Sequence, residues 1–443
     1  MRFRSKLGWL HGAMFPLALF AFAGVGMVYI GVIFTPQTRW VFLALFCFAL
    51  LKAGRLFGAF KTKFGVPLLL YCAWCLLTSL WSIVPELSLL KGFASIVILL
   101  AFTTGGRYWA YGWTSNAPLT FLVPIAVVAV LSAFGGTTAR IGDIELYQGL
   151  TGNPNYLGLI VAASLPVAFY FIYWAFTNQS SIVARVLSIL MGIVLASLLW
   201  RAASRASISC AACETAFAIA ALRPTKMIMI GALAVGAAVI TFITVPAFED
   251  QVYTRFIVKY SPDGDVFYSR REPWRESLEG ARQGGWIGLG YGASYGDTKF
   301  SGGLTSVGYG REKGSSQLAV VEETGLVGAA FYALLIYSIF RELFGGLKRA
   351  PNRDSRMELA LISGLAVGIL FQSIFEAWWT APGSLESAIF WSTVGVGSGL
   401  VRRAARARAR SAIRRSGDWP LDAPVPYQVP AAAKNGQPTH EWG

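Results

Sequence analysis

The feature that most constrains this chain is its series of long apolar stretches, several of which approach or exceed the ~20 residues that cross a bilayer as a helix. The chain is 55% hydrophobic and only 14% charged, with a mean hydropathy of +0.54, whereas soluble globular chains are about 45–50% apolar. A transmembrane barrel would instead show short segments that alternate with period two. We therefore predict an all-α polytopic membrane protein.

Hydropathy predicts about twelve transmembrane helices, and the first is too long for the apolar core of a signal peptide. The predicted spans are residues 13–34, 40–56, 64–84, 86–104, 119–135, 156–174, 181–200, 206–222, 226–246, 316–340, 357–378 and 384–401. The predicted organisation is residues 1–246 with nine spans, 247–315 as one large loop, 316–401 with three spans, and 402–443 as a basic tail.

Basic residues set the predicted orientation. Arg2, Arg4 and Lys6 precede the first span, which places the N-terminus in the cytoplasm, and an even number of spans returns the C-terminus there. Seven arginines from Arg402 to Arg415 follow the last span, so the net charge of +15 reflects a cytoplasmic flank near anionic membrane lipid and not a nucleic-acid partner. The large loop then faces the periplasm of a bacterial inner membrane, and the tail is expected to be disordered.

The large loop carries signals for a short helix and for tight turns. Pro273 suits a first helical turn, Trp274 and Leu278 recur on one face, and Gly284 followed by Gly285 provides a stop. The glycine-rich run that follows contains GLGYG at 288–292. This spacing lacks the strand-to-helix setting of a nucleotide-binding loop, so a flexible, tightly turning loop is favoured over a phosphate cradle.

Positive charges at the predicted periplasmic face are unexpected, because short outer loops are poor in Lys and Arg. The exceptions are Lys91, Arg140, Arg201 and Arg205. A guanidinium forks onto phosphate oxygens, so clustered arginines suit a pyrophosphate ligand. A snorkelling interfacial charge explains Lys91 or Arg201 equally well, whereas Arg205 lies between Ser204 and Ser207 at a span start and is the stronger candidate.

Two further charged sets occur, one within the large loop and one at its end. In the first, Arg270 and Arg271 are candidates for phosphate or sugar contacts, whereas Arg275 has the spacing of an exposed helical pair with Glu279.

In the second set, Glu312, Lys313, Glu322 and Glu323 surround the start of the next span. Carboxylates can act as bases and an ammonium can stabilise an anionic leaving group, and we predict these roles for this set, with Glu312, Lys313 and Glu323 as catalytic residues. Acidic residues in the first turns of an interfacial helix are the alternative interpretation. The two histidines, His11 and His440, lie away from the loop. No acidic cluster has metal-ligand spacing, so we expect no metal and no cofactor.

Four short motifs occur in order around the large loop. They are GLTGNPNYLG at 149–158, Ser204 with Arg205, Arg270 with Trp274 followed by GLGYG, and EETGLVG at 322–328. Together they resemble the signatures of the O-antigen ligase and Wzy-type polysaccharide polymerase superfamily, and the resemblance covers residues 149–328.

This resemblance implies a GT-C-like membrane glycosyltransferase that uses an undecaprenyl-pyrophosphate-linked glycan as donor and needs no metal. It implies that Arg205 and Arg270 grip the pyrophosphate, and it makes Arg271, Asn153 and Asn155 further substrate-binding candidates. The ligases carry a loop His-Asn where this sequence has Gly314 and Ser315. The local sequence is closer to that of the polymerases, so polymerisation of lipid-linked repeat units into O-antigen or exopolysaccharide is the favoured function.

Two alternatives stay open. The first is an O-antigen ligase that transfers finished polymer onto lipid A core or protein. The second is a multi-span transporter of a lipid-linked glycan or an anion, although a transporter would be expected to carry broken helices and paired intramembrane charges in both halves. A separate chain-length regulator is a conceivable protein partner of the polymerase.

Overall fold

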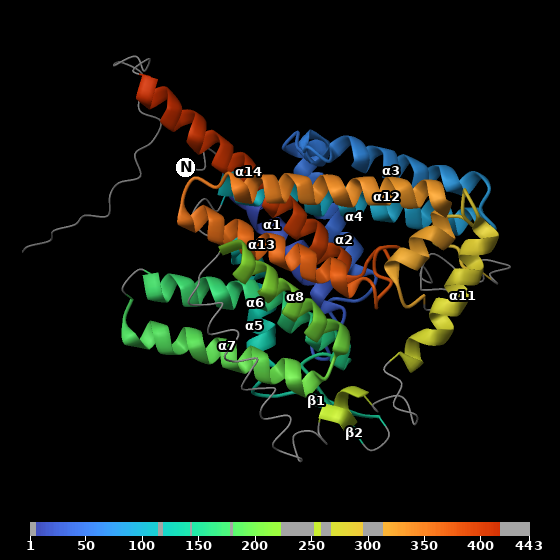
Figure 1. Ribbon diagram of the computed structural model, residues 1–443, viewed down its shortest axis with the longest axis horizontal. Coiled ribbons are helices and arrows are strands. Elements are labelled where there is room, and N and C mark those ends of the chain that lie inside the picture. Colours follow the sequence, from blue (N-terminus) through green and yellow to red (C-terminus); the bar gives the residue numbers. More distant parts are fainter. Residues whose placement is uncertain are drawn as a thin grey trace, which may run out of the picture.

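The structure is a computed structural model that describes residues 6–113, 118–141, 144–177, 180–222, 252–257, 267–295 and 313–416. These residues form a bundle of helices with one short β-hairpin (Figure 1). Five of the described helices are long and apolar enough to cross a membrane. The chain therefore has the build of a helical membrane protein, as predicted.

The described helices follow most of the predicted spans. They are α1 (Lys6–Gly24), α2 (Thr38–Lys52), α3 (Gly65–Leu77), α4 (Pro85–Tyr108), α5 (Val123–Leu131), α6 (Pro154–Thr177), α7 (Ile182–Ala202), α8 (Arg205–Leu222), α11 (Tyr268–Gly284), α12 (Ser316–Lys348), α13 (Arg353–Gln372) and α14 (Leu385–Ser416). The five candidate spans are residues 85–111 around α4 together with α6, α7, α8 and α12. The predicted span 226–246 lies outside the described residues.

Two boundaries differ from the predictions. Helix α1 ends at Gly24 instead of residue 34, because the chain turns back there and the backbone of Val28 donates to the carbonyl of Leu150. The prediction that the basic tail is disordered is wrong for residues 402–416, which extend α14 as a helix. Arg403 pairs with Glu358 of α13, and the alanine- and arginine-rich sequence has high helix propensity.

Glycines let the central helices approach closely. A side chain on Gly395 of α14 would meet the carbonyl oxygen of Thr103 in α4 at 2.3 Å, and one on Gly106 of α4 would meet the carbonyl oxygen of Ser392 at 2.4 Å. Small residues at such crossings give van der Waals contact between backbones, which is a main source of stability where lipid replaces water. Helices α4 and α14 are thus packed backbone against backbone within the bundle.

Replacing Gly395 with Val should therefore lower stability by about 1–3 kcal/mol, because the new side chain collides with backbone that has nowhere to move. Thermal unfolding in detergent measures the effect. Gly192→Val in α7 is the matched control, since its Cβ would meet only the tip of Ile172 at 3.6 Å. Equal stability of the two variants would contradict this view of the core.

Helix α11 lies across one end of the bundle, at the right of Figure 1, and the C-terminal part of α14 projects from the opposite end. The β-hairpin, β1 (Thr137–Ile141) with β2 (Ile144–Gly149), was not expected in an all-α protein. Strand β2 is followed by α6, so the hairpin directly precedes the segment that carries most of the 149–158 motif.

Candidate functional site

The 149–158 motif forms the entry to α6. The side-chain oxygen of Asn153 accepts a hydrogen bond from the backbone of Asn155 at 2.8 Å, and Pro154 occupies the first helical position. An Asn cap followed by Pro satisfies and pre-organises a helix N-terminus. The Tyr156 hydroxyl lies 3.0 Å from the carbonyl oxygen of Phe22 in α1. The motif thus fixes where α6 begins, whatever else it does.

The same motif brings α8 close to α6. A side chain on Gly158 would meet the Ser207 and Ser204 side chains within 2.9 Å, so glycine is needed for the two helices to approach. Ala203 adopts a left-handed conformation (φ 49°) that turns the chain sharply between α7 and α8. Arg205 is therefore held at the N-terminus of α8, where its guanidinium donates to the carbonyl of Phe256 at 3.4 Å.

Helix α11 begins at Tyr268, one turn before the predicted start at Pro273. Arg270 and Arg271 consequently lie within the helix instead of preceding it. Arg270 forms an ion pair with Glu376, with 2.7 Å between Nη2 and Oε1, in the link between α13 and α14. The Trp274 indole donates to the carbonyl of Gly314 at 3.0 Å and thereby fixes the orientation of α11.

Three of the predicted substrate-binding residues line one cavity of about 620 Å³, although they come from distant parts of the sequence. They are Asn155, Arg205 and Arg270, and Glu376 lines the cavity with them. A second cavity of about 630 Å³ shares Asn155, Arg270 and Glu376 with the first and adds Asn153. The two cavities therefore adjoin along these shared residues and form the candidate site.

The electrostatics of the first cavity suit an anion. Two guanidiniums and one carboxylate face it, and the N-terminus of α8 adds the partial positive charge of a helix start. The carboxylate of Glu376 is paired with Arg270. A pyrophosphate bridging the two arginines would be bound by charge-assisted hydrogen bonds.

The other basic candidates lie elsewhere. Arg201 stacks over the ring of Tyr147 with 3.6 Å between guanidinium carbon and ring centroid, and Arg140 is exposed on β1. Arg271 is exposed, and neither cavity is lined by it. Arg275 forms an exposed ion pair as expected, but with Glu272 instead of Glu279.

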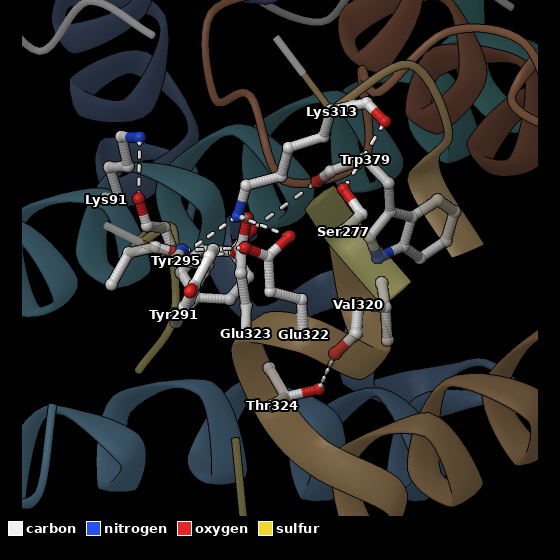
Figure 2. A network of polar contacts seen from close by, with 12 residues as sticks. Lys91, Ser277, Tyr291, Tyr295, Lys313, Val320, Glu322, Glu323, Thr324 and Trp379 are labelled. Carbon is white, nitrogen blue, oxygen red and sulfur yellow. Dashed lines mark hydrogen bonds and ion pairs between the residues drawn. The ribbon is translucent and has the colours of Figure 1, made fainter. Parts of the chain in front are cut away.

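The predicted catalytic residues form a buried ionic cluster. The ammonium of Lys313 lies 2.5 Å from a carboxylate oxygen of Glu323, 3.7 Å from one of Glu322 and 2.8 Å from the carbonyl of Ala293 (Figure 2). All three charged side chains are at most 6% exposed. Glu312 lies outside the described residues. Lys313 and Glu323 line neither cavity, so their catalytic role stays a prediction.

Each carboxylate of this cluster also binds the glycine-rich loop. Glu323 accepts from the backbone of Gly292 at 2.6 Å, and Glu322 accepts from the backbone of Tyr295 at 2.8 Å. Lys91, for which a functional charge and a snorkelling interfacial charge were both open, is buried and donates to the carbonyl of Gly292 at 3.0 Å (Figure 2). The cluster therefore stabilises the loop against α12 and α4.

The GLGYG run turns tightly, as predicted, but it packs against the bundle instead of forming a flexible loop. Gly288, Gly290 and Gly292 all have positive φ angles of 80–110°. The backbones of Leu289 and Gly290 donate to the carbonyls of α12 residues 322 and 323. These carbonyls are available because α12 is broken at Gly325, which has φ 69° and ψ −174°.

Tyr291, the aromatic residue of the run, is buried between helices. Its hydroxyl lies 2.8 Å from that of Ser95 and 3.4 Å from the carbonyl of Trp379. Burial raises the pKa of Tyr291 well above its usual value, so the hydroxyl stays neutral and keeps these hydrogen bonds. The run is thus fixed to both α4 and the α13–α14 link.

A pair of variants separates the structural role of the cluster from a catalytic one. Lys313→Met should lower stability by about 3–5 kcal/mol, because it leaves the Glu323 charge buried without its partner. Lys313→Met combined with Glu323→Gln removes the closest pair of charges and keeps an acceptor for the backbone of Gly292, and it should recover part of that loss, because Glu322 still lies buried without Lys313. Thermal unfolding measures both effects, and Arg275→Met is the exposed control.

The activity of the double variant then decides the role. Recovered stability with recovered activity would mean that the cluster only holds the loop, whereas recovered stability with no activity would support the predicted catalytic roles. Equal stability of Lys313→Met and Arg275→Met would contradict the structural interpretation.

Sequence reasoning missed Glu376. It lies in the short link between the last two helices and follows Phe375, whose ring stacks on Phe267 and Trp274 beside α11. The available signal was an acidic residue close to Trp378 and Trp379 in a link with no other charged residue. Among the described residues, no group of three or more His, Cys, Asp or Glu side chains has the arrangement of a metal site.

The sequence was also compared with known proteins. It matches no model of a known protein family, and it has no match among curated proteins. The class that fold and cavity define is a helical membrane protein with a cavity lined by Arg205 and Arg270.

Proposed function

We propose that this chain is a membrane glycosyltransferase that polymerises undecaprenyl-pyrophosphate-linked repeat units on the periplasmic face of the bacterial inner membrane. The observation that carries the proposal is the meeting of Arg205 and Arg270 in one cavity. The arginines come from α8 and α11, which the sequence separates by 45 residues or more. Both are the residues that the motif resemblance implies as pyrophosphate ligands.

The cavity offers what a pyrophosphate-linked donor requires. Planar guanidiniums bind phosphate oxygens through paired hydrogen bonds, and they stabilise the negative charge that grows on a leaving pyrophosphate. The adjoining second cavity, lined by Asn153 and Asn155, presents amide groups suited to sugar hydroxyls. One cavity would then hold the pyrophosphate and the other the glycan.

The proposed reaction is a displacement at the anomeric carbon. A hydroxyl oxygen at the nonreducing end of one lipid-linked repeat attacks the anomeric carbon of another glycan. The bond between that carbon and the pyrophosphate oxygen breaks, and polyprenyl pyrophosphate leaves with the bonding electrons beside Arg205 and Arg270. The hydroxyl proton passes to a base, and attack opposite to the leaving group inverts the anomeric configuration.

Glu376 is the carboxylate best placed to accept that proton. It lines both cavities, its side chain is 26% exposed, and Arg270 holds it at 2.7 Å. Glu312, Lys313 and Glu323 remain the proposed catalytic residues. Lys313 and Glu323 also form hydrogen bonds with the backbone of the glycine-rich loop. Glu376→Gln should leave donor binding intact and lower the transfer rate, with a changed pH profile of kcat.

The Arg205 contact gives the sharpest test of the activity. Arg205→Ala should lower the rate of transfer roughly 10- to 100-fold, because it removes a charged hydrogen-bond donor from the leaving group. The matched control is Arg201→Ala, four residues earlier, whose guanidinium stacks on Tyr147 and does not line the cavity. Both variants should reach the membrane in wild-type amounts.

The assay uses purified protein in liposomes with lipid-linked repeat units and no lipid A core. A product ladder spaced by one repeat supports the polymerase. Product that forms only after an acceptor lipid or protein is added would instead indicate a ligase, and translocation of the donor without glycosyl transfer would indicate a transporter. Wild-type activity of Arg205→Ala would contradict the assignment of the cavity.

A further inference from the structure

The second cavity of the candidate site, with a volume of about 630 Å³, is lined by two polar residues that the proposed reaction does not use. Gln372 is the last residue of α13, and Glu386 lies in the first turn of α14. Neither lines the first cavity, whereas Asn155, Arg270 and Glu376 line both. A cavity of this size accommodates a small organic ligand. Gln372 and Glu386 therefore extend the candidate site beyond the residues that the two cavities share.

Gln372 has an unpaired amide oxygen. The residue is 3% exposed, and its Oε1 atom is buried without a hydrogen bond from any described residue. The neighbouring hydroxyl of Ser373 is already engaged, because it donates to the carbonyl of Leu370 and accepts from the amide of Gln317. Buried polar groups are nearly always hydrogen-bonded, since an unpaired one costs free energy. An unpaired acceptor in the wall of a cavity thus indicates a ligand that carries hydrogen-bond donors.

The rest of the lining suits the hydroxyl groups of a sugar. Glu386 contributes a carboxyl group and Asn153 contributes an amide. Amide groups donate to and accept from hydroxyls, and a carboxylate accepts from them. The ring of Tyr156 also lines the cavity and is held in place, because its hydroxyl lies 3.0 Å from the carbonyl oxygen of Phe22. A hydrocarbon chain has no donor for Gln372, so membrane lipid tails do not satisfy this lining.

The position of the cavity distinguishes the acceptor sugar from the donor glycan. In the proposed reaction, Arg270 binds the leaving pyrophosphate and Glu376 accepts the proton of the attacking hydroxyl. Both residues line both cavities, so the new bond forms where the cavities adjoin. The attacking hydroxyl approaches opposite to the leaving group, and its sugar therefore needs a space that adjoins the pyrophosphate site without overlapping it. The second cavity provides that space.

We propose that the second cavity binds the nonreducing terminal sugar of the acceptor repeat unit, with Gln372 and Glu386 as ligands of its hydroxyl groups. The inference rests on the proposed function, because it takes the positions of the pyrophosphate and of the base from that reaction. It assigns the second cavity to the acceptor and not to the donor, and it adds one acceptor-binding residue from α13 and one from α14.

Two probes separate the acceptor from the donor, and both are used with the full chain in lipid nanodiscs. The repeat-unit oligosaccharide, released from its lipid and capped as a methyl glycoside, has a nonreducing end but no pyrophosphate, so it acts only as an acceptor. Undecaprenyl pyrophosphate represents the donor without its glycan. The KM of the oligosaccharide is measured with lipid-linked repeat units as donor, and the binding of undecaprenyl pyrophosphate is measured directly.

Gln372→Met should raise the KM of the oligosaccharide roughly tenfold, because a buried hydrogen bond to a hydroxyl is lost, while undecaprenyl pyrophosphate binds unchanged. Glu386→Ala should show the same pattern. The matched control is Glu145→Ala, which removes an exposed carboxylate from β2, outside both cavities, and should leave both values unchanged.

Thermal unfolding distinguishes ligand binding by Gln372 from a structural role. Methionine has nearly the shape of glutamine, and the replaced oxygen has no partner among the described residues, so Gln372→Met should not lower the unfolding temperature. Gln317→Met is the comparison, because it removes a hydrogen bond of 2.7 Å to Ser373 and should lower that temperature. A lower unfolding temperature of Gln372→Met would mean that the protein itself pairs the oxygen, and the proposal would be wrong.

An unchanged KM in both Gln372→Met and Glu386→Ala would overturn the inference, as would an oligosaccharide that the wild type neither binds nor extends. Weaker binding of undecaprenyl pyrophosphate in these two variants would also overturn it, since the second cavity would then hold the donor. Arg270→Ala tests the proposed function separately, because it should weaken undecaprenyl pyrophosphate. If it does not, or if the wild type binds no undecaprenyl pyrophosphate, the proposed function itself is contradicted.

Discussion

The break in α12 at Gly325 is the feature on which the candidate site depends. It frees the carbonyls of Glu322 and Glu323 to accept from Leu289 and Gly290, and it leaves the next two backbone N–H groups to donate to Gly285 and to the following residue. These four hydrogen bonds hold the segment after α11 against the bundle. A side chain at Gly325 would lie 2.3 Å from the carbonyl oxygen of Trp286, so only glycine permits the contact.

The buried charges around this break complete the attachment of α11. Lys313 neutralises carboxylates that would otherwise be costly to bury, and the same carboxylates accept backbone hydrogen bonds from the glycine-rich loop. The loop is fixed at one end of α11 and Trp274 donates to Gly314, so the start of α11 is held beside the cavity that the N-terminus of α8 also lines. Arg270 thereby reaches the cavity that Arg205 lines.

The sequence predicted the helices well because apolar length and composition are local properties. It also named Arg205, Arg270 and Asn155 as substrate-binding candidates, through the rarity of charge at one face and through the motif resemblance, and these three residues line one cavity. It did not predict Glu376 or the partner of Lys91, because both depend on contacts between residues far apart in the chain. The spacing of the glycines indicated tight turns. It did not indicate that the backbone groups exposed by the break in α12 would form hydrogen bonds with these turns.

The most direct test of the account is a structure of the full chain in lipid nanodiscs with undecaprenyl pyrophosphate, determined by cryo-electron microscopy. The account predicts density for the pyrophosphate between the guanidiniums of Arg205 and Arg270, at the N-terminus of α8. Pyrophosphate density at any other place, such as beside the arginines at the end of α14, would contradict it.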